Sequence, residues 1–357
     1  MDPTTPVKVL IVDDSALIRA HLKKQLAGFP FIKIVGLAPD PFVARDILMK
    51  ESPDIVLLDM EMPRMDGLTF LRKIMRYKPT PTLVISSVTP KGSDTALACL
   101  EAGAIDVLCK PSSAYSIDEL QDKIVNWIRE VGRQGSDRIA RRQASLAKIP
   151  DDSAPASGGI ETTNRLIAIG CSAGGPETLR HLLAALPRTT PGIMIVQHMG
   201  PEFLKQMATR LNQASRIEVK LAAEGDSVIP GRALLAPGDK HMELKRQGAR
   251  YTVHLKGGER VSGHMPAVDV LYDSVASAAG ANALGVILTG MGNDGAAGMK
   301  KMRDAGCKTV AQDEESCIVY GMPARAVEAG GVMQSLPLEA IAKRMVDFGK
   351  ATYRESA

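Results

Sequence analysis

Short apolar runs alternate with amphipathic stretches along the first part of the chain, and this alternation constrains the fold more than any other feature. Mainly apolar runs of five residues lie at 8–12, 32–36, 55–59, 82–86 and 106–110. Stretches with helical periodicity follow them, near 15–27, 41–50, 67–77, 93–103 and 116–133. Strands without polar alternation are typical of a parallel sheet that helices cover on both faces. Residues 1–133 are therefore predicted to form a doubly wound, flavodoxin-like (βα)5 domain of the α/β class.

The same alternation starts again after residue 164, so the 357-residue chain has the length and the pattern for two α/β domains. Strands are expected at 166–170, 193–197, 218–222, 285–289 and 308–312, and helices at 176–186, 201–213, 267–280, 295–304 and 337–348. A β-hairpin is expected from the runs at 233–237, 242–244 and 251–255. Residues 164–357 are therefore predicted to form a second doubly wound, mostly parallel domain that includes this hairpin.

The segment 134–163 between the two predicted domains is rich in Gly, Ser, Ala, Pro and Arg and has few large apolar residues. It is interpreted as a flexible basic linker, because it cannot bury a core of its own. The formal net charge of the chain is +4, and residues 129–148 alone carry six basic and two acidic residues. The rest of the chain is near neutral, which argues against a nucleic-acid-binding face.

The cellular compartment is predicted from what the sequence lacks. No apolar run approaches the roughly 18 residues of a membrane span, and residues 1–6 have none of the features of an export signal. The five cysteines are odd in number and show no zinc-ligand spacing. We expect a cytoplasmic protein without structural zinc.

Polar side chains follow the predicted strands of the first domain at their carboxyl ends, where parallel sheets bind ligands. They are Asp13 and Asp14 after the first strand, Asp59 after the third, Ser86 after the fourth and Lys110 after the fifth. Carboxylates, a hydroxyl and an ammonium around one pocket suit Mg²⁺ and a phosphoryl group. Asp59 could attack phosphorus and form an acyl phosphate. Each residue alone has a simpler interpretation, since an aspartate after a strand often caps the next helix, but the complete ordered set favours the site.

These residues and the strings around them, VDDS, LLDMEMPRMDG, ISS and CKP, closely resemble the response-regulator receiver family over residues 7 to about 130. The resemblance implies that a histidine kinase phosphorylates Asp59, which binds Mg²⁺ together with the two aspartates after the first strand. It also implies that Ser86 and Lys110 sense the phosphoryl group. Many receivers carry an aromatic residue at the position of Val107, so the signal is expected to pass through Ser86 and its loop.

In the second domain, an apolar strand is followed by a glycine-flanked serine, Ser172, and then by a helix. The string GCSAG at 170–174 matches G-x-S-x-G, in which a sharp strand-to-helix turn exposes a nucleophilic serine. Two other interpretations stay open on the residues alone. The glycines could simply close a tight turn, or they could form a phosphate-binding loop, although the third glycine of a dinucleotide motif and the P-loop lysine are missing.

A serine nucleophile needs a base, and the second domain offers His181, His198, His241, His254 and His264. His198 is preferred because it ends the next strand along the chain and should reach the same sheet edge, although a histidine there is more often a structural hydrogen-bonding group. Asp294, in the string GMGNDG after a later strand, is the candidate for the orienting acid, although alone it would be interpreted as a helix cap. The glycines beside it would let a backbone N–H approach a reacting oxygen. The chain order Ser, His, Asp differs from that of α/β-hydrolases, so that analogy is rejected.

Taken with the receiver-like first domain, the strings CSAGGPETL, VQHM and LTGMGNDGA resemble the CheB family of chemotaxis protein-glutamate methylesterases over nearly the whole chain. The resemblance implies that Ser172 is the nucleophile, that His198 is the general base and then the acid, and that Asp294 orients the imidazole. It further implies that the backbone N–H of Met291 donates to the oxyanion.

The implied substrate is a glutamate γ-methyl ester on the cytoplasmic bundle of a chemoreceptor, with deamidation of receptor glutamines as a second activity. The esterase step needs no cofactor, and Mg²⁺ is expected only at the receiver. The expected partners are the receptors and a chemotaxis histidine kinase, and the chain would meet the membrane only through the receptors. We hypothesise that the unphosphorylated receiver covers the Ser172 pocket and that phosphorylation of Asp59 opens it.

Three alternative functions differ from this one in what they require of the second domain. One is a phosphorylation-controlled binding module whose second domain hydrolyses nothing, and trapping of Ser172 by a serine-directed reagent would argue against it. A receiver-linked transcription factor would need a helix-turn-helix and a basic face, which the second half lacks. A hydrolase that acts on a receptor outside chemotaxis would have the same site residues.

Overall fold

The computed structural model describes residues 5–86, 90–110, 117–134, 139 and 164–350. The chain divides into two compact units, Met1–Lys148 and Ile149–Ala357, each with its own sheet and core. The predicted linker at 134–163 lies outside the described residues, apart from Gln134 and Ile139. None of the helices in the described part of the chain combines the length and apolar composition that a bilayer span requires.

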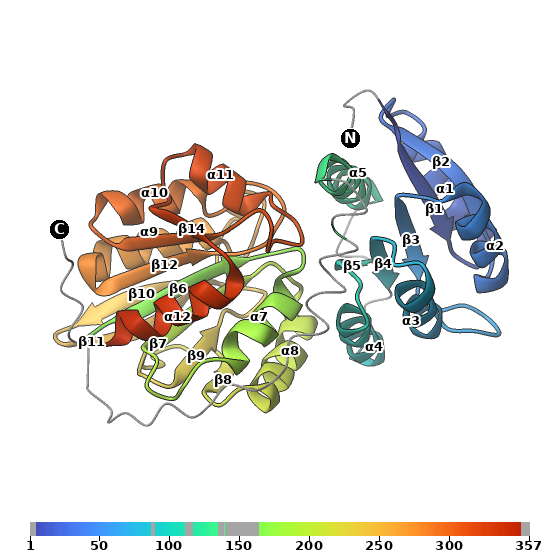
Figure 1. The fold of residues 1–357 in the computed structure, drawn as a ribbon. Helices are drawn as coiled ribbons and strands as arrows, with labels where there is room; N and C mark the ends of the chain where they lie inside the picture. The colour runs from blue at the N-terminus through green and yellow to red at the C-terminus, as the bar shows by residue number, and fades with distance from the viewer. Residues whose placement is uncertain (1–4, 87–89, 111–116, 135–138, 140–163, 351–357) are drawn as a thin grey trace. The chain divides into compact units, whose positions relative to one another are not determined.

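A five-stranded sheet with all strands parallel forms the centre of the first unit (Figure 1). Its strands are β1 (Val7–Val12), β2 (Ile32–Ala38), β3 (Ile55–Asp59), β4 (Thr82–Ser86) and β5 (Asp106–Cys109). Its helices are α1 (Ala16–Leu26), α2 (Pro41–Glu51), α3 (Gly67–Tyr77), α4 (Pro90–Glu101) and α5 (Ile117–Gln134). The strand order β2-β1-β3-β4-β5, with α1 packed beside α5 and α3 beside α4, confirms the predicted flavodoxin-like fold.

Side-chain caps begin several helices of this unit just past the strand ends. Ser15, Asp40 and Asp66 precede α1, α2 and α3, and each side chain accepts a hydrogen bond from a backbone N–H in the first turn. The central strand β3 is buried along its whole length. Its last residue, Asp59, therefore lies at the edge of a buried layer rather than on an open surface.

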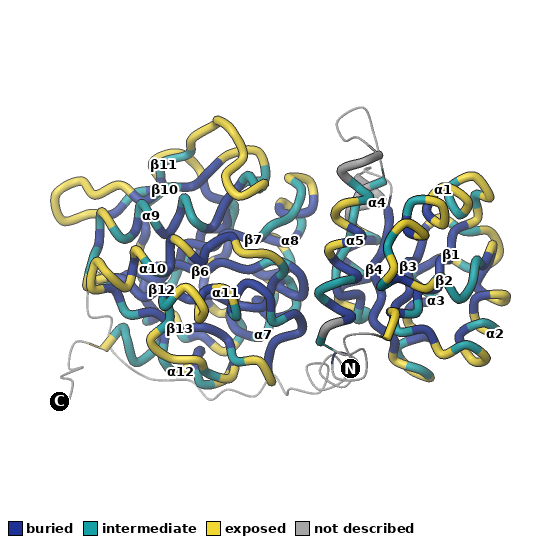
Figure 2. Tube along the Cα trace, turned by 90° about the horizontal axis from the view of Figure 1, so that it is seen from above, coloured by how far each residue is buried: buried dark blue, intermediate teal, exposed yellow. Residues whose placement is uncertain are grey.

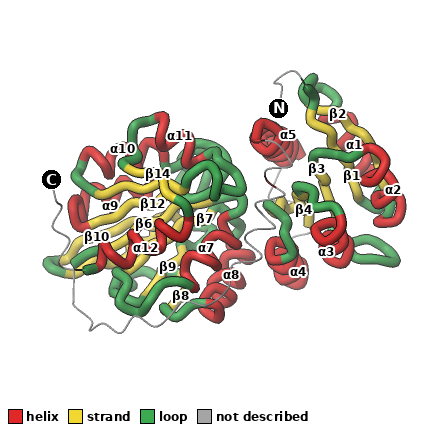
Figure 3. The backbone as a smooth tube through the Cα atoms, viewed as in Figure 1, coloured by secondary structure: helices red, strands yellow, loops and turns green. Residues whose placement is uncertain are grey.

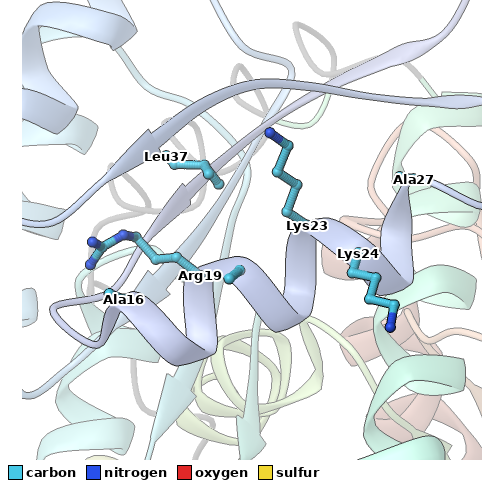
Figure 4. Close-up of a pocket in the computed structure, with 7 residues that line it drawn as sticks. Ala16, Arg19, Lys23, Lys24, Ala27 and Leu37 are labelled. Atoms are coloured by element: carbon cyan, nitrogen blue, oxygen red, sulfur yellow. The ribbon is translucent and has the colours of Figure 1, made fainter.

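A groove of about 550 Å³ lies between α1 and the edge strand β2 (Figure 4). It is lined by Ala16, Arg19, Ala20, Lys23, Lys24, Ala27 and Leu37. Figure 4 shows the side chain of Lys23 extended toward the side on which Leu37 lies. The guanidinium of Arg19 donates a hydrogen bond of 2.7 Å to the carbonyl oxygen of Asp13. Three basic side chains and no acidic one line this groove, so it is positively charged.

The second unit is built on a seven-stranded parallel sheet in the order β14-β13-β12-β6-β7-β9-β8. Its strands are β6 (Leu166–Cys171), β7 (Gly192–Gln197), β8 (Glu218–Leu221), β9 (Arg232–Leu235), β12 (Ala283–Ile287), β13 (Lys308–Gln312) and β14 (Gln334–Leu336). Strands β10 (His241–Gln247) and β11 (Arg250–Lys256) form a separate antiparallel hairpin. The helical elements are α7 (Gly175–Ala184), α8 (Pro201–Ala214), α9 (Val268–Ala279), the 3-10 turn η1 (Gly280–Asn282), α10 (Ala296–Asp304), α11 (Met322–Glu328) and α12 (Leu338–Gly349).

One strand of this unit lies elsewhere than the sequence predicted. The run 233–237 was expected in the hairpin, but β9 pairs in parallel with β7 and β8 in the main sheet. Its residues Ala233, Leu234 and Leu235 are fully buried, as a strand covered on both faces requires. The hairpin consists of β10 and β11 alone. The sequence pattern also missed α11 and β14, because seven-residue and three-residue elements carry little periodicity.

Helices cover both faces of the large sheet (Figure 3). On one face α7 packs beside α8 and α12, and on the other α10 packs beside α9 and α11. The buried strands β6 and β7 run through the middle of the unit (Figure 2). The chain leaves β6 toward β7, β8 and β9 and later returns to β12 on the other side of β6. The topological switch point, where such sheets bind ligands, is therefore at the carboxyl ends of β12, β6 and β7.

Candidate functional site

Three carboxylates and an ammonium meet at the carboxyl ends of β1, β3 and β5 in the first unit. Carboxylate oxygens of Asp13, Asp14 and Asp59 lie within 4.8 Å of one another, and Asp14 is the exposed one of the three. The Nζ atom of Lys110 lies 2.8 Å from Oδ1 of Asp59 and 3.4 Å from Oδ2 of Asp13. Ser86 is buried at the end of β4, where its carbonyl oxygen accepts a 2.8 Å hydrogen bond from the N–H of Lys110. Three carboxylates and the Lys110 ammonium thus lie together at this sheet edge, and the backbone of Ser86 lies next to that of Lys110.

Burial and the ion pair act in opposite directions on the pKa values of Asp59 and Lys110. Burial raises the pKa of Asp59, although the hydrogen bond and the charge of Lys110 act in the opposite direction. Burial alone would lower the pKa of Lys110, but its interactions with Asp59 and Asp13 outweigh burial and raise it. Oδ2 of Asp59 is buried and has no hydrogen-bond partner among the described residues. This oxygen is therefore left to bind a cation or to attack a phosphorus atom.

The donor set fits a small, hard divalent cation. Mg²⁺ takes oxygen ligands and is typically bound by one or two carboxylates together with waters and phosphate oxygens. Asp13 and Asp59 supply buried carboxylates, and the exposed Asp14 supplies a third at the open side of the pocket. The unsatisfied Oδ2 of Asp59 gives such an ion a specific place to bind.

In the second unit, Ser172 lies directly after β6 on a tight turn into α7. Its N–H donates to the carbonyl oxygen of Thr289 at 3.1 Å, and its own carbonyl oxygen accepts from the N–H of Gly175 at 2.8 Å. Gly174 has a φ of 75°, in the left-handed region that favours glycine. A Cβ atom on Gly290 would lie 3.0 Å from the Cβ atom of Ser172. The serine turn therefore packs directly against the glycine-rich loop after β12.

The strand register brings His198 to the position next to this turn. Cys171 and Gln197 are opposite each other in the β6–β7 ladder, and the N–H of His198 donates to the carbonyl oxygen of Cys171 at 3.1 Å. Ser172 and His198 therefore follow on neighbouring strands, which lie ~4.8 Å apart in a sheet. The side chains of Cys171 and Gln197 meet at 3.1 Å on one face. By alternation, the side chains of the two following residues leave on the other face.

A buried carboxylate holds one nitrogen of the His198 ring. Nε2 of His198 lies 2.7 Å from Oδ2 of Asp294, and the two side chains are 6% and 1% exposed. Asp294 also accepts hydrogen bonds from the N–H groups of Val268 at 2.8 Å and Asp269 at 2.9 Å, in the first turn of α9. Burial acts to raise the pKa of Asp294, but the hydrogen bonds from His198 and from these N–H groups lower it. An ionised Asp294 can only accept, so it requires a proton on Nε2 of His198.

The second nitrogen of the His198 ring is left with a lone pair. Nδ1 is buried and has no hydrogen-bond partner within the described parts of the chain. With the proton on Nε2, this Nδ1 atom is the basic nitrogen of a neutral imidazole. Ser172 and His198 directly follow the paired strand ends of β6 and β7. A serine nucleophile requires such a basic nitrogen on an imidazole whose other nitrogen is hydrogen-bonded to a carboxylate.

The loop after β12 offers a backbone donor next to the serine turn. The N–H of Gly290 donates to Val319, and its carbonyl oxygen accepts from the N–H groups of Gly321 and Met322, all at 2.9–3.0 Å. The N–H of the next residue, Met291, donates to no acceptor among the residues that the structure describes. An unpaired N–H in a loop held this firmly can stabilise a developing oxyanion.

One further histidine lies at this site, which the sequence offered only as one of five candidate bases and did not place beside His198. His264 stacks on His198, with ring centroids 3.7 Å apart and ring planes at 1° to each other. His181 and His254 instead pair with glutamates, at 2.9 and 3.0 Å. His264 lies in an irregular loop between β11 and α9, and no strand end or motif in the sequence marked it.

Comparison with known proteins identifies families and relatives that resemble both units of the chain. Residues 167–345 match the family model for CheB methylesterase, and residues 9–124 match that for the response regulator receiver domain. A protein-glutamate methylesterase/protein-glutamine glutaminase of Anaeromyxobacter dehalogenans is 51% identical over 340 residues, which cover 95% of this chain and 94% of that protein. A protein of the same description from Pseudomonas aeruginosa is 47% identical, with 96% of each chain covered. Among solved structures, the Thermotoga maritima CheB methylesterase catalytic domain matches with a TM-score of 0.51 and 37% identity, and the match covers 52% of this chain and 98% of that one.

Proposed function

The chain belongs to the CheB methylesterase family, and on that premise we propose that it hydrolyses glutamate γ-methyl esters on chemoreceptors under the control of its receiver domain. The two relatives described above carry the names of both a glutamate methylesterase and a glutamine glutaminase. The proposed activities are therefore demethylation of receptor glutamates and deamidation of receptor glutamines. The proposed place of action is the cytoplasm, at the cytoplasmic domains of the receptors.

In the proposed mechanism, Ser172 is the nucleophile and His198 the general base. The Oγ atom of Ser172 attacks the ester carbonyl carbon while its proton passes to Nδ1 of His198. The N–H of Met291 donates a hydrogen bond to the oxyanion, and Asp294 stabilises the imidazolium through Nε2. The imidazolium then gives its proton to the methoxy oxygen, and methanol leaves. A water molecule then attacks the acyl group, with His198 again acting as base and then as acid. This step releases glutamate and free Ser172.

A single observation carries this assignment. Asp294 holds Nε2 of His198 at 2.7 Å, and Nδ1 is left buried without a partner at the edge of the sheet where Ser172 follows β6. A histidine with a purely structural role would normally have both ring nitrogens satisfied, because a buried unpaired nitrogen costs stability. The unpaired Nδ1 therefore favours a catalytic base over a structural histidine.

At the receiver, we propose that a histidine kinase transfers a phosphoryl group to Asp59. Asp13, Asp14 and Asp59 would hold Mg²⁺, which supplies charge neutralisation for the transferred group when it is bound. Lys110, now 2.8 Å from Asp59, would pair with the phosphoryl oxygens, and Ser86 would donate a hydrogen bond to them. Phosphorylation would relieve an inhibition of the esterase domain by the receiver. Removal of residues 1–150 should then raise the esterase activity, whereas unchanged or lower activity would contradict this form of control.

The decisive experiment measures methanol release from methylated receptor membranes, with and without acetyl phosphate as phosphodonor. The intact chain is compared with Ser172→Ala and Asp59→Ala. We expect Ser172→Ala to release no methanol above background, and Asp59→Ala to keep the basal rate without stimulation. Release by Ser172→Ala at the wild-type rate would refute the nucleophile, and receptor binding without any methanol release would identify a binding module instead.

A further inference from the structure

His264 contacts the face of the His198 ring, whereas Asp294 binds its edge. The two imidazole rings are parallel to within 1°, and their centroids are 3.7 Å apart, so the rings are in van der Waals contact. The two contacts restrict different motions. The edge contact fixes where Nε2 lies, and the face contact fixes the plane of the ring.

The segment that carries His264 is tied down at several points. The N–H of each of Val261 and His264 donates to the carbonyl oxygen of the other, at 3.0 and 2.9 Å. The two residues between them, Ser262 and Gly263, have φ values of 52° and 79°, as in a tight type I′ turn. The hydroxyl of Ser262 donates to the Asp269 carboxylate on α9 at 3.4 Å. The turn is therefore attached to the same helix end that binds Asp294.

His241 fixes both ends of this segment. Its Nδ1 accepts a hydrogen bond of 3.2 Å from the N–H of Ala267, and its Nε2 donates to the carbonyl oxygen of Glu259 at 2.9 Å. These partners assign the proton to Nε2, because a carbonyl oxygen can only accept and an N–H can only donate. The His241 side chain is buried. The loop 259–267 is thus held at both ends by hydrogen bonds to one buried side chain.

We propose that His264 is a positioning residue for the catalytic base, an inference that rests on the proposed function. Its ring holds the plane of His198 so that Nδ1 faces Ser172 while Nε2 stays on Asp294. The ring of His264 also provides a polarisable face for the imidazolium that His198 becomes during the reaction.

The test compares three variants of the full chain in methanol release from methylated receptor membranes. His264→Ala removes the ring, and His264→Phe keeps a flat ring of similar thickness. His254→Ala removes a histidine that pairs with Glu224 instead of with the site residues. We expect His264→Ala to lower kcat on the order of tenfold or more, with KM changed by less than about twofold, because a misplaced base slows chemistry and not binding. We expect His264→Phe to recover most of kcat, and His254→Ala to match the wild type. Equal kcat for His264→Ala and the wild type would overturn the proposal, as would a loss in His264→Phe as large as that in His264→Ala.

A second measurement separates positioning from folding and does not depend on activity. Side-chain ¹⁵N spectra of histidine-labelled protein report the tautomer of each ring, with His198→Gln used to assign the signal. We expect the Nε2–H form of His198 in the wild type and in His264→Phe, and a mixture of forms in His264→Ala with its thermal unfolding transition retained. An unchanged His198 signal in a folded His264→Ala variant would refute the inference. Absence of methanol release from the wild type would refute the proposed function, and the tautomer comparison would still decide the role of His264.

Discussion

Replacement of Asp294 by asparagine probes the charge of the buried carboxylate while keeping its shape. Both carboxylate oxygens accept backbone hydrogen bonds, Oδ2 from Val268 at 2.8 Å and Oδ1 from Asp269 at 2.9 Å, and Oδ2 also binds His198 at 2.7 Å. An asparagine has only one acceptor oxygen, so its NH₂ group must face at least one N–H donor. If the NH₂ group faces His198, it reverses the tautomer and leaves a proton on Nδ1, which can then no longer act as a base.

The size of both effects follows from these contacts. A reversed tautomer in a triad of this kind lowers kcat by about 10⁴. The N–H donor of Val268 is buried and that of Asp269 partly buried, and a buried N–H left without an acceptor costs about 1–3 kcal/mol of unfolding free energy. In a unit of this size, 1 kcal/mol lowers Tm by about 2–4 °C. We therefore expect a folded protein with a measurably lower Tm and almost no esterase activity.

The assay is methanol release from methylated receptor membranes, together with thermal unfolding of the same preparations. Asp273→Asn is the matched control, because Asp273 lies on α9 and pairs with Lys301 at the surface. We expect the control to keep wild-type activity and to change Tm by little, since exposed ion pairs contribute less than about 1 kcal/mol. An Asp294→Asn variant with activity within tenfold of the wild type would refute the assigned role of the carboxylate.

Three further predictions concern the two sites. Lys110→Ala removes the cation 2.8 Å from Asp59, so acetyl phosphate should no longer stimulate methanol release while the basal rate persists; retained stimulation would contradict the assigned role of Lys110. The pKa of Asp294 is lowered in the folded protein, so its carboxylate stabilises the fold above the ordinary value of 3.8 and loses this contribution as the pH falls through the lowered pKa. Denaturant titrations should therefore show the unfolding free energy of the wild type falling more steeply below that pH than that of Asp294→Asn, and parallel curves would argue against an ionised Asp294. Gly290→Ala places a Cβ atom against Met322 and 3.0 Å from the Cβ of Ser172, so it should cost about 1–3 kcal/mol of unfolding free energy and most of kcat, and a fully active variant would show that the serine turn tolerates displacement.

Much of both candidate sites could be predicted because parallel sheets place the carboxyl ends of their strands at one edge. Asp59 and Lys110 are far apart in the sequence, but each follows a buried strand, and the structure brings them to 2.8 Å. His198 and Asp294 are likewise 96 residues apart and lie 2.7 Å from each other. In such cases the local strand pattern and a general rule of α/β topology together carry long-range information.

The remaining features depend on packing that leaves no local pattern. His264 approaches His198 only because a type I′ turn, a bond to α9 and the buried His241 hold its loop in place, and none of these contacts has a periodic signature. The run 233–237 carries the apolar residues of a strand, but its pairing with β7 and β8 is decided by burial on both faces rather than by its distance from the hairpin in sequence. Short elements such as α11 and β14 are stabilised by their neighbours and not by their own pattern.

The most direct test of the account is to observe the acyl-enzyme on Ser172. Methylated receptor is mixed with an excess of the full chain, and the reaction is quenched at short times. The protein is then digested, and the peptide that contains Ser172 is analysed by mass spectrometry. We predict a receptor glutamyl peptide joined to Ser172 by an ester, formed at the rate of methanol release and absent from Ser172→Ala. Methanol release at full rate with no adduct on Ser172 at any time, or with the adduct on another residue, would contradict the central claim.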